Sequence, residues 1–434
     1  HAYQATPEYR RTRTVESLGM VYKTHYPFHS MQTARGAKLS PLNAQLVARG
    51  AYFRDVSGWE GADWFTPDGS PPDPGPLSFG RPTWFSNWKA EHDAARNNVI
   101  LMDMSFMSKF LVQGRDAGAV LNYISANNVD DMCGRVTYTQ WLNEGGTLEA
   151  DLTVSKLDDA RYFVVASDTA HRHVATWLKR HTPNDAHCIT TDVTSAYAQI
   201  NIQGPRSRAL MQAVTTADMS NDAFPFRTAR EIDIGFARIL CLRITYLGEL
   251  GYEVYIPAEQ AVPVYERLVE AGASLGLRHA GLKALASLRM EKGYRDYGHD
   301  IDNTDSVLEA GLGFAVDLKK PAGFIGKEAV VAKKAAGPLA RRLLQVRLTE
   351  PEPLLFHAEP IWRNGIAVGY VRAASYGHTL GGAVGLAMID AGAEVLDQAW
   401  INAGTWEIEV ADRRHAAVAS LAPMYDPKNE KIKA

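Results

Sequence analysis

One aspartate occupies a position where a β-sheet could present it to a ligand. Asp151 lies in the run RVTYTQWLNEGGTLEADLTV at residues 135–154, whose alternating apolar residues around a glycine pair predict two strands joined by a turn. Period-two alternation puts Asp151 and Thr153 on the face away from Leu152 and Val154. A carboxylate on such a face can accept a proton or stabilise a developing positive charge. The alternative is an aspartate that only ends a turn.

A glutamate in a second run stands beside a glycine. The run RITYLGELGYEVYIP at residues 243–257 reads as two half-buried strands with a tight turn between them, the first carrying Ile244 and Tyr246 on one face. In the second strand, alternation places Glu253 level with Gly251, so the carboxylate lies beside backbone that carries no side chain. This arrangement predicts a seat for a flat ligand rich in hydrogen-bond donors. A glutamate on the solvated outer face of a sheet is the alternative.

An arginine falls on the apolar side of a predicted helix. Leu282, Leu285 and Arg289 follow helical spacing in the run GLKALASLRMEKGYRDYGHDID, which points the guanidinium inward. A buried guanidinium requires an acidic or carbonyl partner. That partner could be a carboxylate of the protein, such as Glu291, or a ligand carboxylate gripped in bidentate fashion.

Two groups of polar residues suggest a metal site, but neither supports one. His171 and His173 are two apart on a predicted helix, so their side chains do not face each other. His299, Asp300 and Asp302 form a run that caps and turns more readily than it encloses an ion. We therefore expect no metal ligands in this chain.

The composition is that of an ordinary globular protein. The 434 residues are 46% apolar and 22% charged, and the formal net charge of −3 gives no basic field for nucleic acid or an anionic membrane. Three widely spaced cysteines support neither a disulfide framework nor a thiolate zinc site, and they favour a reducing compartment. No stretch approaches the ~20 apolar residues of a membrane span. The start at His1, without an apolar leader, indicates a processed product or a piece of a longer protein.

The elements that must position these residues fall into three regions. Residues 1–78 are irregular, aromatic and basic, with a short helix expected within Leu39–Phe53 after the capping residue Ser40. Residues 79–338 alternate strands and helices without the pattern of a parallel sheet, which predicts two α+β subdomains with antiparallel sheets flanked by helices. Residues 339–434 carry short strands punctuated by glycines and predict an all-β barrel or sandwich.

The first region holds more aromatic side chains than an irregular segment can leave in water. Six of them are Tyr26, Phe28, Tyr52, Phe53, Trp59 and Trp64. They could pack against the following domain or against a partner that this chain lacks. We expect them to form a docking surface for such a partner.

Five runs, in order, give the chain a resemblance to a known family. They are NIQGPRSR at 201–208, GELGYEVYIP at 248–257, SLRMEKGYRDYGHDID at 287–302, GFIGKEA at 323–329 and SYGHTLGGAVG at 375–385. With them, nearly the whole chain resembles the glycine-cleavage T-protein (aminomethyltransferase) family, and more closely the carboxyl-terminal folate-binding half of the dimethylglycine and sarcosine dehydrogenases. The first region resembles the segment that those dehydrogenases place between their flavin and folate halves. The resemblance implies a three-domain cloverleaf with tetrahydrofolate at its centre.

The resemblance also implies roles for individual residues. Asp151 matches the family's catalytic aspartate beside the reactive nitrogens of folate, and Tyr138 matches the tyrosine next to it. Glu253 matches the glutamate that hydrogen-bonds the pterin, whose edge of N–H donors suits a fixed carboxylate. Four further residues in the matching motifs are expected to bind folate: Glu249, Arg289, Tyr252 and Tyr297.

The function implied is one-carbon transfer. An oxidised N-methyl amine is an electrophilic iminium, and tetrahydrofolate supplies the nitrogen that takes its carbon, which gives 5,10-methylene-tetrahydrofolate and a demethylated amine. The sequence has no Gly-x-Gly-x-x-Gly run after a strand, so we expect FAD on a missing amino-terminal half or on a partner flavoprotein. A stand-alone folate-dependent demethylase or aminomethyltransferase and a non-catalytic folate-binding regulatory subunit are the alternatives.

The expected surroundings follow from the same resemblance and composition. The compartment is the cytoplasm, or the mitochondrial matrix in a eukaryote. The expected partners are a small N-methyl amine or its iminium, a flavoprotein domain or subunit, and a second copy of this chain in a homo-oligomer. Nucleic acid and membranes are not expected partners.

Overall fold

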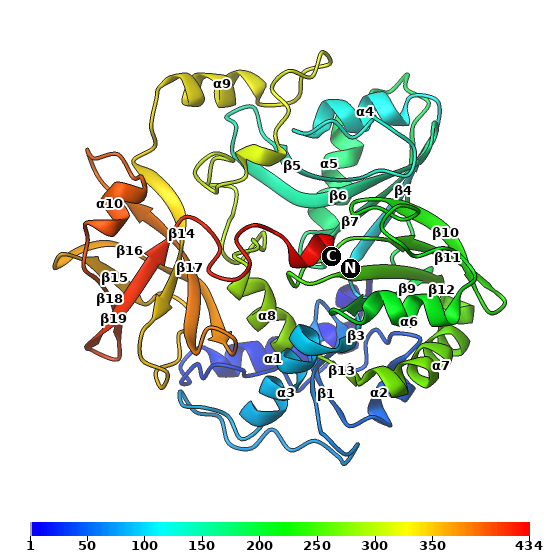
Figure 1. Cartoon of the computed structure of the whole chain (residues 1–434), viewed down its shortest axis with the longest axis horizontal. Coiled ribbons are helices and arrows are strands. Elements are labelled where there is room, and N and C mark those ends of the chain that lie inside the picture. The colour runs from blue at the N-terminus through cyan, green and yellow to red at the C-terminus, as the bar shows by residue number, and fades with distance from the viewer. Residues whose placement is uncertain (1) are drawn as a thin grey trace.

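The computed structural model, which describes residues 2–434, has three lobes arranged around helix α8 (Leu282–Glu291) (Figure 1). The lobes are a five-stranded sheet, a six-stranded sheet and a closed six-stranded barrel. Helices flank the sheets, so the predicted α+β fold with antiparallel sheets and a C-terminal β-barrel is confirmed.

The first lobe is an antiparallel sheet. Its strands lie in the order β5 (Val136–Leu142), β6 (Leu148–Asp158), β7 (Arg161–Ala166), β4 (Ser108–Gln113) and β8 (Ile189–Asp192). Helices α4 (Ala117–Ile124) and α5 (His171–His181) share one buried apolar core with Leu152 and Val154 of β6. The hairpin expected over residues 135–154 is therefore formed by β5 and β6.

The second lobe is also mainly antiparallel. Its strands lie in the order β10 (Ala229–Ile234), β11 (Ala237–Leu242), β12 (Gly251–Pro257), β9 (Tyr197–Gln203), β3 (Val99–Asp103) and β13 (Leu277–His279), the last pair being parallel. Helices α6 (Ser207–Val214) and α7 (Ala261–Gly272) pack in one core with Tyr252 and Val254 of β12.

The two sheets face each other across a smaller apolar cluster. Val136, Phe163 and Val165 of the first sheet are buried in this cluster, as are Leu242 and Tyr255 of the second. Other side chains on the same faces of these strands are therefore directed into the space between the sheets. This arrangement positions the candidate site.

One of the predicted strands is wrong. Residues 243–250 form a loop between β11 and β12, whereas alternation had placed Ile244 and Tyr246 on one strand face with a tight turn after them. The Thr245 hydroxyl accepts a backbone N–H from two residues further on at 3.1 Å, and Gly248 has a φ of 82°. These two features bend the chain, so the run cannot continue the ladder.

Residues before the sheets form helices and a hairpin. They contain α1 (Pro7–Met20), α2 (Asn43–Val47), β1 (Ala51–Val56), β2 (Trp59–Phe65) and α3 (Phe85–Asn97). Of these elements, α3 and β2 pack on α8. The helix expected within Leu39–Phe53 is confined to α2, because Gly50, with a φ of 76°, turns the chain into β1. The Ser40 hydroxyl accepts the N–H of Leu42 at 3.1 Å, just before the helix begins.

Some aromatic side chains of this segment are buried within the chain's own core, and the others keep part of their surface exposed. Trp59 and Trp64 pack in one cluster with Trp84 and Trp88. Phe28 lies edge-on to Trp84, with 5.3 Å between ring centroids. The following domain therefore covers these rings, and the predicted docking surface is wrong for Trp59 and Trp64.

The third lobe is a closed barrel. Its strands lie in the order β14 (Arg341–Leu348), β17 (Gly382–Asp390), β16 (Ile366–Gly377), β15 (Pro360–Arg363), β18 (Trp406–Val410) and β19 (Arg413–Ser420). Helix α9 (Lys327–Ala335) precedes it and α10 (Gln398–Asn402) interrupts it. Short 3-10 helices are η1 (Ala2–Ala5), η2 (Ala258–Gln260), η3 (Ala273–Leu275), η4 (Gly313–Ala315) and η5 (Lys431–Lys433).

Among residues 2–434, no helix combines the length and apolar character needed to cross a bilayer.

The C-terminal segment leaves the barrel and returns across the centre of the molecule (Figure 1). The Tyr425 hydroxyl donates to Glu249, and the guanidinium of Arg96 stacks on the Tyr425 ring at 3.7 Å from its centroid. Arg96 also forms ion pairs with Glu249 at 2.9 Å and with Glu291 of α8 at 2.8 Å. One buried arginine thus joins α3, α8, the loop before β12 and the C-terminal segment.

Candidate active site

The register of β5 and β6 places four polar side chains on one face. Tyr138 stands opposite Thr153, and Gln140 stands opposite Asp151. Leu152, which lies between Asp151 and Thr153 on β6, points to the opposite face and is buried in the core under α4 and α5. The face predicted for Asp151 is therefore confirmed, and it is the face directed toward the second sheet.

Asp151 is held by donors from the neighbouring strand. The Gln140 amide donates to Oδ1 of Asp151 at 2.9 Å, and the Tyr138 hydroxyl faces the same carboxylate. Burial raises the pKa of Asp151 to about 7, although the two donors lower it, and the charges of Asp296 and Asp300 raise it further. The carboxylate can therefore take up and release a proton near neutral pH.

Tyr138 stays protonated over the physiological range. Burial, and then the charge of Asp151, raises the pKa of Tyr138 well above its ordinary value. Its ring stacks on Phe314 of η4, with 6.1 Å between centroids and 25° between planes. Tyr138 can therefore act as a hydrogen-bond donor to Asp151 or to a ligand beside it.

Arg289 finds its partner inside the protein. Its Nη1 lies 2.7 Å from Oδ2 of Asp300, and the two residues are 6% and 0% exposed. Oδ1 of Asp300 accepts the backbone N–H of Asp296 at 2.6 Å. The acidic partner expected for the buried guanidinium is therefore Asp300. Glu291, the residue suggested from the sequence, pairs with Arg96 instead. A ligand contact for Arg289 stays a prediction.

Tyr246 lies beside this ion pair in the loop 243–250. Its ring stacks on Tyr294, with 5.9 Å between centroids and 21° between planes, and its hydroxyl donates to the carbonyl of Arg295. Burial, followed by the charge of Asp296, raises the pKa of Tyr246 well above its ordinary value. The loop conformation, rather than a strand face, brings this ring toward Asp151.

Glu253 lies on the face of the second sheet that is directed toward the first. The register sets it opposite Leu242 and Asn201, on the face of Tyr255. The Tyr255 hydroxyl donates to Oε2 of Glu253 at 2.6 Å. Burial raises the pKa of Glu253 to about 7, against the lowering effect of the tyrosine and of Lys109. The alternative of a solvated outer-face glutamate is therefore wrong.

The backbone beside Glu253 is not open to a ligand as expected. A Cβ at Gly251 would lie 1.9 Å from Oε1 of Gln203 on the adjacent strand β9. The Gln203 amide donates to the carbonyl of Ile244 at 3.3 Å. The glycine therefore makes room for a buried glutamine, and the predicted seat above Gly251 is wrong.

Lys109 places a cation between the sheets. It stands opposite Val165, which stands opposite Thr153, so the lysine shares the face of Asp151. Its ammonium donates to two backbone carbonyls at 2.7 and 2.9 Å. Burial lowers the pKa of Lys109 to about 7, although several carboxylates, Glu253 among them, oppose this shift.

The remaining residues expected to bind folate are placed differently. Glu249 is 2% exposed and is engaged by Arg96. Tyr252 points away from Glu253 into the core under α6 and α7, and its hydroxyl lies 3.4 Å from a backbone carbonyl. Tyr297 packs against the same apolar cluster as Tyr138. Folate contacts for all three stay predictions, and Tyr297 alone of them shares surroundings with Tyr138.

Three residues of this region were missed by sequence reasoning. Gln140 could have been predicted from the sequence, because alternation puts it on the face of Tyr138 and the hairpin pairing then sets it opposite Asp151. Lys109 lies two strands from β6, and only the sheet order brings it onto the same face. The position of Tyr246 depends on the conformation of the loop 243–250, which alternation does not predict. In the part of the chain that the structure describes, no group of three His, Cys, Asp or Glu side chains could hold a metal ion.

Three protein families match the chain in succession. Residues 42–320 match the family described as the GCVT N-terminal domain, and residues 341–426 match the glycine cleavage T-protein C-terminal barrel domain. Residues 1–40 match the FAD dependent oxidoreductase central domain. The second match covers the closed barrel, and the first covers both sheets.

Several characterised proteins are similar over most of the chain. The 4-methylaminobutanoate oxidase (formaldehyde-forming) of Paenarthrobacter nicotinovorans is 38% identical, over 99% of this chain and 51% of that protein. Mitochondrial sarcosine dehydrogenase of Homo sapiens is 32% identical, over 100% of this chain and 51% of that protein. An aminomethyltransferase of Listeria monocytogenes is 33% identical, over 88% of this chain and 96% of that protein. The chain thus spans about half the length of the first two relatives.

A solved structure shares the fold. The glycine cleavage system aminomethyltransferase T from Bartonella henselae matches with a TM-score of 0.75 at 22% identity, over 90% of this chain and 99% of that one. The arrangement of two sheets and a barrel around α8 is therefore common to both.

Proposed function

This chain belongs to the glycine cleavage T-protein family, and on that basis we propose that it is the tetrahydrofolate-dependent one-carbon transfer module of an FAD-linked N-methyl amine dehydrogenase or oxidase. The observation that carries the proposal is Asp151, whose carboxylate has a pKa of about 7 and stands beside Tyr138 and Gln140 on the inner face of the first sheet. The products would be 5,10-methylene-tetrahydrofolate and a demethylated amine.

The residues of the two facing sheets fit tetrahydrofolate. The edge of a pterin carries several N–H donors, and Glu253 offers its Oε1, to which no residue in the described range 2–434 donates. Asp151 supplies a second acceptor on the opposite sheet. When bound, tetrahydrofolate would supply the nucleophilic nitrogen that takes the one-carbon unit.

The role of Asp151 follows from its charge. The carboxylate would accept the proton that leaves the nitrogen as the new carbon–nitrogen bond forms. Before that step, its negative charge would stabilise the positive charge of an incoming iminium. The hydrogen bond from Gln140 to Oδ1 fixes the orientation of the carboxylate, and so also the direction in which Oδ2 points.

A flavoprotein partner would supply the iminium. The match of residues 1–40 to the FAD dependent oxidoreductase central domain supports this part of the proposal, as does the length of the oxidase and dehydrogenase relatives, about twice that of the chain. An iminium hydrolyses in water to formaldehyde and an amine. Direct transfer therefore requires that the flavin site and the folate site exclude water between them.

The test is the fate of the oxidised methyl group. The chain is produced together with its flavin-bearing partner, and free formaldehyde and 5,10-methylene-tetrahydrofolate are both measured during oxidation of sarcosine. Asp151→Asn should slow methylene-tetrahydrofolate formation on the order of 100-fold and divert the carbon to formaldehyde, with the rate of amine oxidation unchanged. Asp158→Asn, an exposed change on the same strand, is the matched control. Equal methylene-tetrahydrofolate yields from Asp151→Asn and native protein would refute the role of Asp151.

A second candidate is a stand-alone aminomethyltransferase. It is favoured by the Listeria relative, which the chain matches over nearly its whole length. In that case the isolated chain would transfer carbon from a free methyl donor without any flavoprotein. Folate binding without turnover, even beside a flavoprotein, would instead indicate a regulatory subunit.

A further inference from the structure

Helix α1 turns its apolar side chains toward water. Val15 and Leu18 are each 67% exposed, and Tyr22, just after the helix, is 99% exposed. Their spacing of three and four residues places them on one side of the helix. Val21, which caps the helix with helical backbone angles and is 57% exposed, extends the group. These four residues form what we call the outer stripe.

The opposite side of α1 is polar and is bound to the rest of the chain. The guanidinium of Arg13 donates to Oδ2 of Asp55 at 2.7 Å and to the carbonyl of Thr33 at 2.6 Å. The carboxylate of Glu16 accepts the backbone N–H groups of Gln32 at 2.6 Å and Thr33 at 2.8 Å. A surface helix ordinarily buries its apolar face and exposes its polar face. In α1 this order is reversed, and the hydrogen bonds hold the helix in that orientation.

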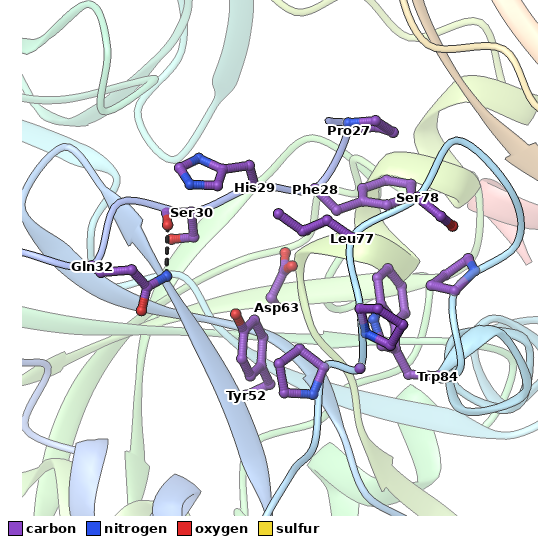
Figure 2. Close-up of a pocket in the computed structure, with 14 residues that line it drawn as sticks. Pro27, Phe28, His29, Ser30, Gln32, Tyr52, Asp63, Leu77, Ser78 and Trp84 are labelled. Atoms are coloured by element: carbon purple, nitrogen blue, oxygen red, sulfur yellow. Dashed lines mark hydrogen bonds between the residues drawn. The ribbon is translucent and has the colours of Figure 1, made fainter. Parts of the chain in front are cut away.

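Two other aromatic residues of the first segment are covered differently. Phe28 and Tyr52 line a pocket of about 130 Å³, and its other walls include Trp84 and residues 74–78 (Figure 2). These two rings therefore face parts of the same chain. The outer stripe, in contrast, is left uncovered by residues 2–434. Exposed apolar groups that lie together mark an interaction surface.

Basic side chains surround the outer stripe. Arg10 and Arg11 on α1 and Lys23 after it are exposed, and none of the three forms an ion pair within the part of the chain that the structure describes. They outnumber Glu8, the one exposed acid of the helix. A partner that covers the stripe should therefore offer an apolar patch edged by carboxylates.

The family matches indicate which partner this is. Helix α1 lies within residues 1–40, which match the FAD dependent oxidoreductase central domain, and outside residues 42–320, which match the GCVT N-terminal domain. The helix thus belongs to the flavin-linked part of the match and not to the transferase part. We propose that the outer stripe is the surface on which the flavin-bearing partner docks, an inference that rests on the proposed function.

A partner on the outer stripe would be held in a fixed position relative to the first lobe. The Tyr3 hydroxyl donates to the carbonyl of Ser57 at 2.6 Å, and the Ser57 hydroxyl donates to Oδ2 of Asp168 at 2.5 Å. Ser57 directly follows β1, to which α1 is bound through Asp55, and Asp168 lies between β7 and α5. The turn at Ser57 therefore joins α1 to the lobe that carries Asp151. Direct transfer of an iminium requires such a fixed arrangement of the two sites.

Hydroxyl-radical footprinting tests the surface on the native chain. The chain is produced alone and together with its flavin-bearing partner, and the oxidation of single residues is followed by mass spectrometry. Tyr22 should be oxidised at least about five-fold more slowly in the complex, because the core of an interface excludes water. Tyr123, which is 50% exposed on α4, is the control and should react equally in both samples. Equal oxidation of Tyr22 in both samples, with flavin present in the complex, would overturn the proposal.

A charge placed in the outer stripe provides a second test. Leu18→Glu should weaken binding of the flavin-bearing partner about 30-fold or more, because the interface would bury a carboxylate among apolar side chains. Since Leu18 is 67% exposed, the free chain should keep its fold and its unfolding midpoint in urea. Val331→Glu, at a 45% exposed position of α9, is the matched control. Binding is measured as the flavin retained per chain on dilution, and equal retention in the two variants would overturn the proposal.

Other occupants of the outer stripe predict different results. A second copy of the chain would protect Tyr22 in the absence of flavoprotein, and the protection would increase with the concentration of the chain. An anionic bilayer would protect Tyr22 when vesicles of phosphatidylserine and phosphatidylcholine are added. Either result, combined with no protection by the flavin-bearing partner, would overturn the proposal.

These measurements need neither folate nor turnover. Protection of Tyr22 by the flavin-bearing partner, with no effect of Asp151→Asn on methylene-tetrahydrofolate formation, would leave the docking surface in place and remove the proposed function. Direct transfer in a complex in which Tyr22 stays reactive would have the opposite meaning.

Discussion

Gln140 and Asp151 stand directly opposite each other on β5 and β6, with 2.9 Å between the amide nitrogen and Oδ1 of the carboxylate. Burial favours the protonated acid, whereas the donated hydrogen bond favours the ionised form. The balance between them sets the pH range over which Asp151 can accept a proton.

The first prediction concerns that range. If Asp151 is the base as proposed, the rate of methylene-tetrahydrofolate formation should rise with pH and reach half its maximum near pH 7, because only the ionised carboxylate can accept a proton. Gln140→Leu removes a donor to the ionised form and should move the midpoint upward by about 1 unit. Single-turnover rates between pH 5.5 and 9 measure both. Gln398→Leu in the barrel helix is the control, and an unmoved midpoint in Gln140→Leu would contradict the role of this pair.

The second prediction concerns Glu253. Glu253→Ala should weaken tetrahydrofolate binding by roughly 1.5–3 kcal/mol, because pterin donors would lose a charged acceptor. Calorimetry measures the dissociation constant. Glu231→Ala, on the same sheet but exposed, should leave it unchanged. Equal affinities in both variants would limit Glu253 to a structural role between the sheets.

The third prediction concerns the ion pair of Arg289 and Asp300. Arg289→Met should lower the free energy of unfolding by about 3–5 kcal/mol, because it leaves the fully buried Asp300 carboxylate without its cation. Adding Asp300→Leu should recover part of that loss. Urea unfolding measures both variants, and Lys89→Met, in the exposed pair with Asp93, should cost little. A small effect of Arg289→Met on stability, with a large effect on folate affinity, would favour a ligand role instead.

The fourth prediction concerns Glu91, which is fully buried and accepts the N–H groups of Phe65 at 2.7 Å and Gly281 at 2.9 Å. Burial raises the pKa of Glu91 from 4.5 to about 8 in the folded state. The unfolded chain therefore loses this proton first as pH rises, so the contribution of Glu91 to stability is complete below pH 4.5 and is lost on the way to pH 8.

Glu91→Gln cannot ionise and isolates this effect. Its stability relative to the native protein should improve with rising pH between 5 and 8, by at most about 1.4 kcal/mol per pH unit. Urea unfolding at four pH values gives the difference. Glu8→Gln, an exposed change on α1, should show no such trend. A difference for Glu91→Gln that does not vary with pH would show that Glu91 is ionised in the folded protein.

Local patterns predicted which way several side chains of the site point. The faces of Asp151 and Glu253 and the inward position of Arg289 follow from the geometry of a single strand or helix. The residues that contact these side chains could not be predicted in the same way, because they lie on other segments of the chain. Asp300 reaches Arg289 only because the chain turns after α8, and Gln203 fills the space above Gly251 from a different strand.

Composition was less informative about the first segment. Many aromatic residues in an irregular stretch indicate that something covers them, but not what covers them. For Trp59 and Trp64 the cover is the chain's own core, which holds Trp84 and Trp88. Alternation likewise cannot separate a strand from a loop such as 243–250, where a side-chain hydrogen bond and a glycine bend the chain.

Arg96 joins parts of the chain that are made at different times. Its partner Glu291 follows it by 195 residues, and Tyr425 comes later still. At roughly 5–20 residues per second, a ribosome takes roughly 10–40 s between the arginine and that glutamate. During this interval both sheets emerge, while the charges that will be buried beside α8 are still hydrated. The contacts of Arg96 with Glu291 and Tyr425 can therefore be completed only after the barrel and Tyr425 have been made.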